Sequence, residues 1–150
     1  MRIALGSDHA GFDLKQIALN TLKEMGHDCE DFGCYDTSSV DYPDIAVKVC
    51  QAVVEGRCDR GILVCSTGTG MCIVANKIKG IRAALCPDTF TARRAREHNN
   101  ANVICLGAWV IGRGLLQEIL TAYLISEFVG GRHTRRLEKV QAVEDASCGK

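Results

Sequence analysis

Hydrophobic and polar positions follow two alternating patterns along the chain, and these patterns predict strands and helices in turn. Short, almost continuous apolar runs predict strands at residues 2–8, 61–66, 81–86 and 102–107, and the more polar segment 27–33 is a further strand candidate. Apolar residues at helical spacing predict helices between them, at residues 11–26, 42–55, 71–78, 87–99 and 113–129. The pair Gly130-Gly131 interrupts the last of these patterns, and a further helix is expected over residues 132–145.

This alternation predicts a single domain of the α/β class over residues 1–150. Strands that alternate with helices form parallel sheets covered on both faces, and right-handed crossovers favour a doubly wound arrangement. We therefore expect a three-layer α/β/α sandwich with a five-stranded parallel sheet, flavodoxin-like or Rossmann-like. The extra C-terminal helix is expected to pack on a partner subunit.

The composition is that of a globular protein, and it narrows the classes of partner. Hydrophobic residues make up 47% and charged residues 24% of the 150 residues, and the formal net charge is zero. Without an excess of positive charge, the chain lacks the electrostatic footprint of nucleic-acid binding. No apolar run approaches the roughly 18 residues of a membrane span, and the N-terminus soon turns polar, unlike a secretory signal. We expect no nucleic-acid or membrane partner and a cytoplasmic location.

Nine cysteines are many for a chain of this length. An odd number cannot pair completely, most of them lie within apolar runs, and no C-x-x-C spacing occurs. These features favour reduced cysteines that pack as small apolar side chains in a reducing compartment. Cys65 is treated separately, because it stands where a predicted strand ends and a glycine-rich loop begins.

Polar clusters occur around the ends of the predicted strands, and ligands of open parallel sheets bind beyond the carboxyl ends of the strands. These clusters are Gly6–His9, Asp41–Asp44, Cys65–Gly70 and Pro87-Asp88 after the first four strands, with His98 and Asn99 just before the fifth.

The segment LVCSTGTGM, residues 63–71, places a thiol at a strand end and only small residues directly after it. Successive small residues expose backbone N–H groups at a helix N-terminus, which suits a phosphate or a developing oxyanion. The same positive dipole favours the thiolate form of a neighbouring cysteine. A thiolate beside such amides could remove a proton next to a carbonyl group and leave an enediolate.

Other phosphate-binding or nucleophilic loops fit this segment less well. A dinucleotide fingerprint needs a third glycine where Ile73 stands, and a Walker loop needs a lysine that the loop lacks. A cysteine phosphatase needs an arginine shortly after its nucleophile, but none lies between Cys65 and Arg82. A flavodoxin-type loop for FMN would follow a different strand.

Several motifs together resemble one known family, the type B ribose-5-phosphate isomerases and the related galactose-6-phosphate isomerase subunits. They are GSDHAGF, DYPD, LVCSTGTGM, ANKIKGIRAAL, REHNNANVICLG and GGRHTRRLEKV, and they occur in the family's order over nearly the whole chain. The resemblance implies the same fold as the hydrophobic pattern, and an aldose–ketose isomerase that acts on a phosphosugar.

The resemblance also implies a role for each matched residue. Cys65 would be the base that moves a proton between C2 and C1, and Thr67 would orient it. His98, with Asn99, would open the furanose ring by general acid–base catalysis. The remaining roles are amide donors to the enediolate (Gly68, Thr69, Gly70), contacts to sugar hydroxyls (Asp8, Tyr42) and phosphate ligands (His9, Arg132, Arg136).

Members of this family build their site between two subunits, so the resemblance implies a homodimer, with a tetramer as the alternative. His98 and Asn99 would come from the neighbouring chain. The four-residue spacing of Arg132 and Arg136 puts both on one face of a helix, where guanidinium groups suit phosphate oxygens. No metal or other cofactor is expected, because the amides and Thr67 would stabilise the enediolate.

Three positions depart from the family's pattern. Ser66 stands where glycine is usual, so it must tolerate that backbone geometry or shift the loop. Trp109 stands where most members have an arginine that reaches the neighbour's phosphate, and Arg113 is a possible substitute. Some members use a glutamate base at the position of Met71, so the thiol route is favoured here.

The sequence therefore predicts a ribose 5-phosphate to ribulose 5-phosphate isomerase, part of the non-oxidative pentose phosphate pathway. Two alternatives stay open. One is the same chemistry on a six-carbon substrate such as allose or galactose 6-phosphate. The other is a phosphosugar-binding subunit without activity, against which the intact set of Cys65, Thr67, Asp8 and His98 argues.

Overall fold

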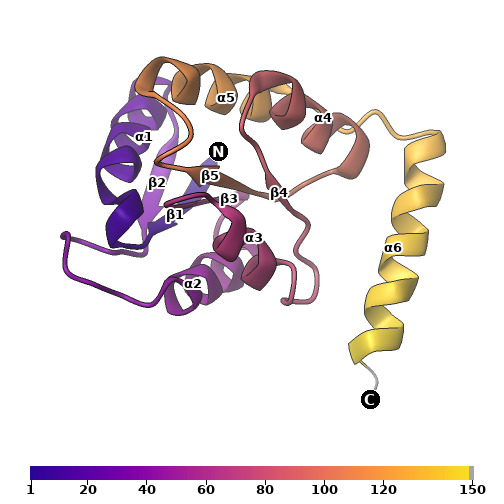
Figure 1. The fold of residues 1–150 in the computed structure, drawn as a ribbon. Helices are drawn as coiled ribbons and strands as arrows, with labels where there is room; N and C mark the ends of the chain where they lie inside the picture. The colour runs from indigo at the N-terminus through magenta and orange to yellow at the C-terminus, as the bar shows by residue number, and fades with distance from the viewer. Residues whose placement is uncertain (149–150) are drawn as a thin grey trace.

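The computed structural model describes residues 1–148 and contains one parallel sheet with helices on both faces (Figure 1). The strands are β1 (Arg2–Ser7), β2 (Asp28–Asp31), β3 (Arg60–Cys65), β4 (Ala83–Leu85) and β5 (Val103–Gly107). The helices are α1 (Phe12–Glu24), α2 (Tyr42–Val54), α3 (Thr69–Ala75), α4 (Thr89–Asn99), α5 (Arg113–Ile125) and α6 (Arg132–Cys148), with a 3₁₀ turn at His9–Gly11.

The sheet has the order β2-β1-β3-β5-β4, and all its neighbouring strands are parallel. Helices α1, α4 and α5 cover one face, and α2 and α3 cover the other (Figure 1). The predicted three-layer sandwich with an extra C-terminal helix is thereby confirmed. The order differs from that of flavodoxin only at one edge, where β4 and β5 have exchanged places.

Two apolar clusters fill the spaces between the sheet and its helices. One cluster includes Ile104, Leu106 and Tyr123 under α1, α4 and α5, and the other includes Leu63 and Val49 under α2 and α3. Because both faces of β3 and β5 are covered, these strands are apolar along nearly their whole length and do not alternate. Cys50, Cys58, Cys65 and Cys105 belong to the second cluster, as small buried side chains.

The exposed edge of the sheet at β4 is partly covered by one side chain. The amide of Asn76 donates to the carbonyl of Ala83 at 2.9 Å and accepts from the N–H of Ala83 at 2.9 Å. Asn76 thus replaces a neighbouring strand at this position, which protects an edge that could otherwise pair with another chain.

The predicted helix over residues 113–129 is four residues too long. Helix α5 ends at Ile125, Ser126 has an extended ψ of 143°, and its hydroxyl donates to the carbonyl of Ala122 at 2.7 Å. The chain then crosses to the end of α4, where the N–H of Val129 donates to the carbonyl of Glu97 at 3.1 Å. This long-range contact, which helical periodicity cannot report, ends the helix early.

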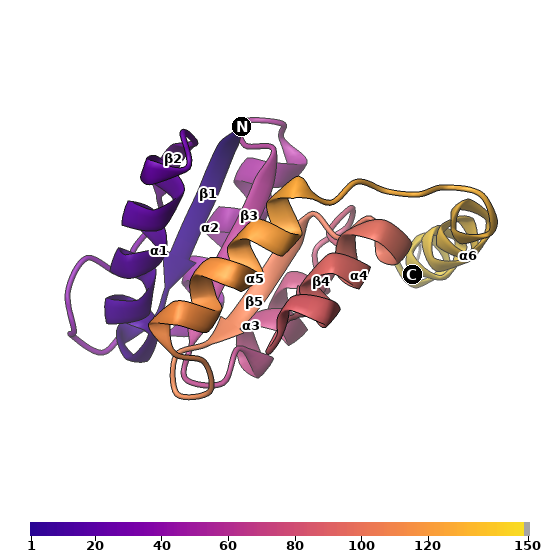
Figure 2. The same cartoon turned by 90° about the horizontal axis from the view of Figure 1, so that it is seen from above.

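Helix α6 stands beside the β4 edge, apart from the three layers of the sandwich (Figures 1 and 2). It begins beside α4, where His133 stacks on His98. Near its other end, the carboxylate of Glu144 accepts from the N–H of Gly80 at 3.1 and 3.2 Å. Within residues 1–148, no helix is both long and apolar enough to cross a membrane.

Candidate active site

Cys65 ends β3 with its side chain almost fully buried, at 4% exposure. The backbone N–H of Gly68 donates to its sulfur at 3.1 Å, so the loop turns back onto the thiol. Gly68 has a positive φ of 79°, and a Cβ added there would lie 2.6 Å from Leu85 and 2.9 Å from Leu106. Glycine is therefore required at this position. The backbone of Thr69 then begins α3, and its N–H donates to the hydroxyl of Thr67 at 3.4 Å.

Tyr42 lies directly against this loop, although it is distant in sequence. A Cβ added to Gly70 would lie 2.9 Å from the Tyr42 ring, so the absence of a side chain at Gly70 makes room for the aromatic ring. Tyr42 is the first residue of α2, and Pro43 follows where the first turn of a helix tolerates proline. The ring is 38% exposed, so part of it remains available to a ligand.

Asp8 and His9 follow β1 on the same carboxyl edge. The N–H of Asp8 donates to the carbonyl of Val64 at 3.1 Å, and its carboxylate accepts from the N–H of Gly11 at 2.9 Å. Asp8 therefore caps the turn that leads into α1. The Nδ1 atom of His9 accepts from the N–H of Val40 at 3.4 Å, which leaves Nε2 to carry the proton in the neutral ring.

A second group of predicted residues lies at the end of α4. The rings of His98 and His133 stack with centroids 4.1 Å apart and planes within 10°. The guanidinium of Arg94 lies 3.2 Å from Nε2 of His98. Desolvation lowers the pKa of His133, and the positive charges of His98, Arg132, Arg136 and Arg94 lower it further, in that order. Arg132 and Arg136 therefore belong to the same cationic group as His98.

These two groups lie at opposite ends of the sheet within one chain. Helix α4 begins after the carboxyl end of β4 and runs back, so that His98 and Asn99 come just before β5 starts. Cys65, by contrast, pairs in register with Gly107, where β5 ends. The length of β5 separates the two levels by about 15 Å. One chain therefore brings together Asp8, His9, Tyr42 and residues 65–70, and separately His98, Asn99, Arg132 and Arg136.

Two of the positions that depart from the family pattern, Ser66 and Trp109, are joined by a backbone hydrogen bond. Among residues 1–148 the only non-glycine residue with positive φ is Asn100, so Ser66 fits its place without backbone strain. The N–H of Trp109 donates to the carbonyl of Ser66 at 2.9 Å, and that of Ala108 to the carbonyl of Cys65 at 2.8 Å. Trp109 thus lies beside the thiol loop, and its indole is 77% exposed.

Sequence reasoning missed two residues at the second group. The motifs assigned no role to Arg94, whose guanidinium contacts His98. They also assigned no role to His133, whose ring stacks on that of His98. The four-residue spacing between Arg94 and His98 was the available signal for the first contact. No local signal could have revealed the second, because the two histidines lie on different helices. In the part of the chain that the structure describes, no cluster of three or more His, Cys, Asp or Glu residues is placed to hold a metal.

Comparisons with known proteins identify the family to which this chain is similar. The model of the family Ribose/Galactose Isomerase matches residues 3–140. The D-erythrulose-4-phosphate isomerase of Pectobacterium atrosepticum is 48% identical over 93% of this chain and 93% of its own length. The structure of Clostridium thermocellum ribose-5-phosphate isomerase B has a TM-score of 0.97 at 47% identity, covering 98% of this chain and 99% of that one.

Another similar structure contains a bound sugar phosphate. Ribose-5-phosphate isomerase B from Mycoplasma genitalium, solved with bound ribulose-5-phosphate, has a TM-score of 0.91 at 40% identity, with 96% of each chain covered. The family model spans most of the chain and these relatives match it almost end to end, so the chain belongs to the Ribose/Galactose Isomerase family and is an aldose–ketose isomerase, as its resemblance to the type B ribose-5-phosphate isomerases implies.

Proposed function

We propose that this protein interconverts ribose 5-phosphate and ribulose 5-phosphate through an enediolate, with Cys65 as the base and no cofactor. The observation that carries the proposal is the 3.1 Å approach of the Gly68 N–H to the Cys65 sulfur. A thiolate is stabilised by such a donor, and the neighbouring amides of the loop can stabilise an oxyanion close to it. A base and an oxyanion site side by side are what proton transfer between two adjacent carbons requires.

In this proposal the other residues take the roles that the family resemblance implies. His98, with Asn99, opens the ring by moving a proton between the ring oxygen and the anomeric hydroxyl. Cys65 then takes the proton from C2 of the aldose and returns it to C1, while Thr67 orients the thiol. The amides of residues 68–70 hold the enediolate oxygen. Asp8 and Tyr42 bind sugar hydroxyls at the carboxyl edge, and His9, Arg132 and Arg136 bind the phosphate.

The active form in this proposal is a homodimer whose sites are shared between subunits. Cys65 and His98 serve one reaction, yet they lie at opposite ends of the sheet within one chain. A second copy can bring its His98 and its arginines to the first copy's thiol loop. The enzyme is proposed to act in the cytoplasm, where cysteines stay reduced as thiol chemistry requires.

A second candidate function differs in the number of carbons of the sugar phosphate substrate. A relative with 48% identity is named D-erythrulose-4-phosphate isomerase, so a four-carbon ketose phosphate is one candidate substrate. Trp109 adds a reason, because it puts a neutral, exposed indole beside the thiol loop. Allose and galactose 6-phosphates are the six-carbon candidates to include.

The experiment compares kcat/KM for ribose 5-phosphate with the values for D-erythrulose 4-phosphate, allose 6-phosphate and galactose 6-phosphate. We expect the highest value for ribose 5-phosphate, and we expect Cys65→Ala to abolish turnover of every substrate used. Cys58→Ala is the matched control, since Cys58 is an equally buried cysteine at the other end of β3. Near-normal turnover by Cys65→Ala would disprove the thiol as base, and a higher kcat/KM for another sugar would reassign the substrate.

A further inference from the structure

Lys15 is a charged residue with a fully buried side chain, at 0% exposure on the inner side of α1. Its ammonium group donates to both carboxylate oxygens of Asp31, at 2.6 and 2.7 Å, and to the carbonyl of Cys34 at 2.6 Å. These contacts satisfy all three donors of the ammonium group. A buried charge is tolerated only when it is paired so completely. The proposed isomerisation assigns no role to this lysine.

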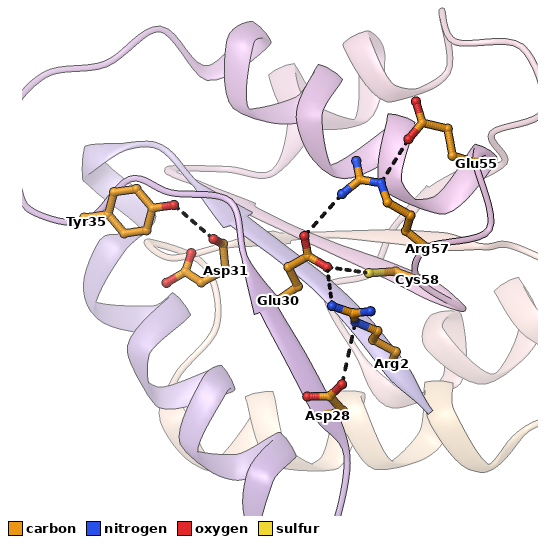
Figure 3. Close-up of polar contacts among 8 residues, drawn as sticks. All are labelled: Arg2, Asp28, Glu30, Asp31, Tyr35, Glu55, Arg57 and Cys58. Atoms are coloured by element: carbon orange, nitrogen blue, oxygen red, sulfur yellow. Dashed lines mark hydrogen bonds and ion pairs between the residues drawn. The ribbon is translucent and has the colours of Figure 1, made fainter.

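Lys15 and residues 31–35 form a compact hydrogen-bonded cluster at the end of β2, here called the Lys15 cluster. Asp31, the last residue of that strand, also accepts from the N–H of Gly33 at 2.9 Å. The hydroxyl of Tyr35 donates to the carbonyl of Asp31 at 3.0 Å (Figure 3). The Lys15 nitrogen lies 5.4 Å from the centre of the Tyr35 ring and 5.8 Å from that of Phe12. One cation therefore organises residues 31–35, which belong to neither a strand nor a helix beyond Asp31.

The Lys15 cluster is hydrogen-bonded to Ser7, the last residue of β1, which directly precedes Asp8. The N–H of Ser7 donates to the carbonyl of Gly33 at 2.7 Å, and the N–H of Cys34 donates to the carbonyl of Ser7 at 2.7 Å. Ser7 is fully buried, so it cannot move independently of these two bonds. The position of the Asp8 backbone therefore depends on residues that Lys15 holds.

The Lys15 cluster also holds one end of the connection between β2 and α2. Residues 35–41 form no helix or strand, and most of them are exposed. At the other end of this connection, Val40 donates to Nδ1 of His9, and Tyr42 starts α2 with its ring against Gly70. Thus Lys15 holds the start of the connection whose other end contacts His9 and leads into Tyr42.

We infer that Lys15 is a positioning residue of the isomerisation: by clamping residues 31–35 onto the end of β1, it places Asp8, His9 and Tyr42 for the sugar phosphate. It acts through these residues and does not touch the substrate itself. The inference rests on the proposed function, because Asp8, His9 and Tyr42 are there assigned to substrate binding.

The test replaces Lys15 with Met, an unbranched apolar side chain that keeps most of the packing. We expect kcat/KM for ribose 5-phosphate to fall about 10- to 100-fold through misplacement of the binding groups, mainly through a higher KM. Hydrogen exchange supplies a readout that needs no activity: the amides of Ser7, Cys34 and Val40 should exchange faster, while those of β3 and β5 stay protected. Arg2→Met is the matched control, since Arg2 starts β1 and pairs with Asp28, at the start of β2, and with Glu30 (Figure 3).

A second variant separates positioning from a merely structural role. Lys15→Met alone leaves the Asp31 carboxylate without its cation, which can lower stability by itself. Lys15→Met/Asp31→Asn removes both charges and keeps an acceptor for the Gly33 N–H, so it should regain melting temperature. We expect its KM to stay high, because nothing holds the carbonyl of Cys34.

The results of these experiments test the positioning role of Lys15 separately from the proposed function. A parental KM with unchanged exchange in Lys15→Met, or recovery of the parental KM in the double variant, would overturn the inference. If Lys15→Met does not fold, the double variant alone carries the comparison with Arg2→Met. A parent protein that isomerises none of the sugar phosphates would instead refute the proposed function, and the exchange data would still decide whether Lys15 holds this segment.

Discussion

At the scale of single residues, the cysteines of this chain differ sharply in how easily they become thiolates. A hydrogen bond from the thiol of Cys105 lowers the pKa of Cys72 to about 7, with smaller contributions from the backbone of Leu85 and the side chain of Asn76. Burial raises the pKa of Cys50 and of Cys86 to about 12. Desolvation also raises the pKa of Cys29, although Cys29 and Cys72 are both only partly buried.

We therefore expect iodoacetamide to modify Cys72 well before Cys29 at neutral pH. The thiolate is the reactive form, and its fraction at Cys72 rises as the pH rises through about 7. The rate of labelling at Cys72 should follow that curve, and the rate at Cys29 should increase only at higher pH. Peptide mass spectrometry at a series of pH values measures both rates. Equal rates at the two cysteines would show that exposure alone controls the labelling.

Trp109 lies beside the thiol loop, where its backbone N–H donates to the carbonyl of Ser66. An arginine there could add a charge-assisted hydrogen bond to phosphate, on the order of 1.5–3 kcal/mol, whereas the indole offers a single neutral donor. We expect Trp109→Arg to lower KM for ribose 5-phosphate and to leave the proposed dimer intact. Trp109→Gln, which removes the ring without adding charge, is the control. Weaker ribose 5-phosphate binding, or six-carbon activity absent from the parent, would make Trp109 a selectivity residue and reopen the substrate assignment.

At the scale of elements, helix α4 begins with a side-chain cap at Asp88. Asp88 caps this helix: its carboxylate accepts from the N–H of Thr91 at 2.7 Å and from the Thr91 hydroxyl at 2.9 Å. The backbone hydrogen bond from Thr91, followed by the one from its side chain, lowers the pKa of Asp88 below its usual 3.8. The cap therefore contributes stability above pH 3.8 that is lost as the pH falls through the lower, folded-state pKa.

Replacement of Asp88 by Ala should lower the melting temperature at pH 7, because one of the first N–H groups of α4 loses its acceptor. Asp88→Asn keeps an acceptor without a titrating charge, so it should lie between Ala and the parent at pH 7. Thermal unfolding from pH 7 to pH 2 measures both effects. The difference between the parent and Asp88→Asn should shrink as the pH falls. A difference that is constant with pH would show that the carboxylate charge adds nothing to the cap.

The elements were largely predictable from the sequence, because their signals are local. The apolar run of β3 and the apolar spacing of α1 each report which side of an element is buried. The exchanged order of β4 and β5 was not predictable, since right-handed crossovers permit either order. The early end of α5 depends on the bond between Val129 and Glu97, which joins two helices.

The residues of the site were predictable as a set, but their contacts were not. Motifs identified Cys65 and His98 by type and order along the chain. The stack of His133 on His98 and the three bonds of Lys15 join segments that only the folded chain brings together. Such long-range contacts leave no periodic pattern in the sequence, and the placement of His98 far from Cys65 emerges only once α4 is seen to run back along the sheet.

At the scale of the whole molecule, helix α6 suits contact with a second copy of the chain. Its two ends are held by His133 and Glu144. Between them, a groove of about 650 Å³ is lined by Leu137, Val140 and Ile81 among other residues. Val140 and Val143 remain more than half exposed, at 52% and 68%. Exposed apolar surface of this kind favours burial by a partner chain, as the proposed homodimer would provide.

The proposed sharing of active sites between subunits predicts that two inactive variants can complement each other. In a mixed dimer of Cys65→Ala with His98→Asn, one site carries both changes and the other carries neither. We expect each pure variant to be nearly inactive on ring-closed ribose 5-phosphate, and the mixed dimer to recover about half of the parental activity. Co-expression with two different affinity tags and purification over both yields the mixed dimer alone.

The matched control pairs Cys65→Ala with Thr67→Ala, two changes in the same half of the site. Each site of that mixed dimer contains one changed loop residue, so no intact site forms and the activity stays low. Recovery with His98→Asn but not with Thr67→Ala requires that Cys65 and His98 of one site belong to different chains. Failure of both pairs to recover would mean that each chain completes its own site, and helix α4 or α6 would then have to move to bring His98 to the thiol, because the sheet holds the two apart.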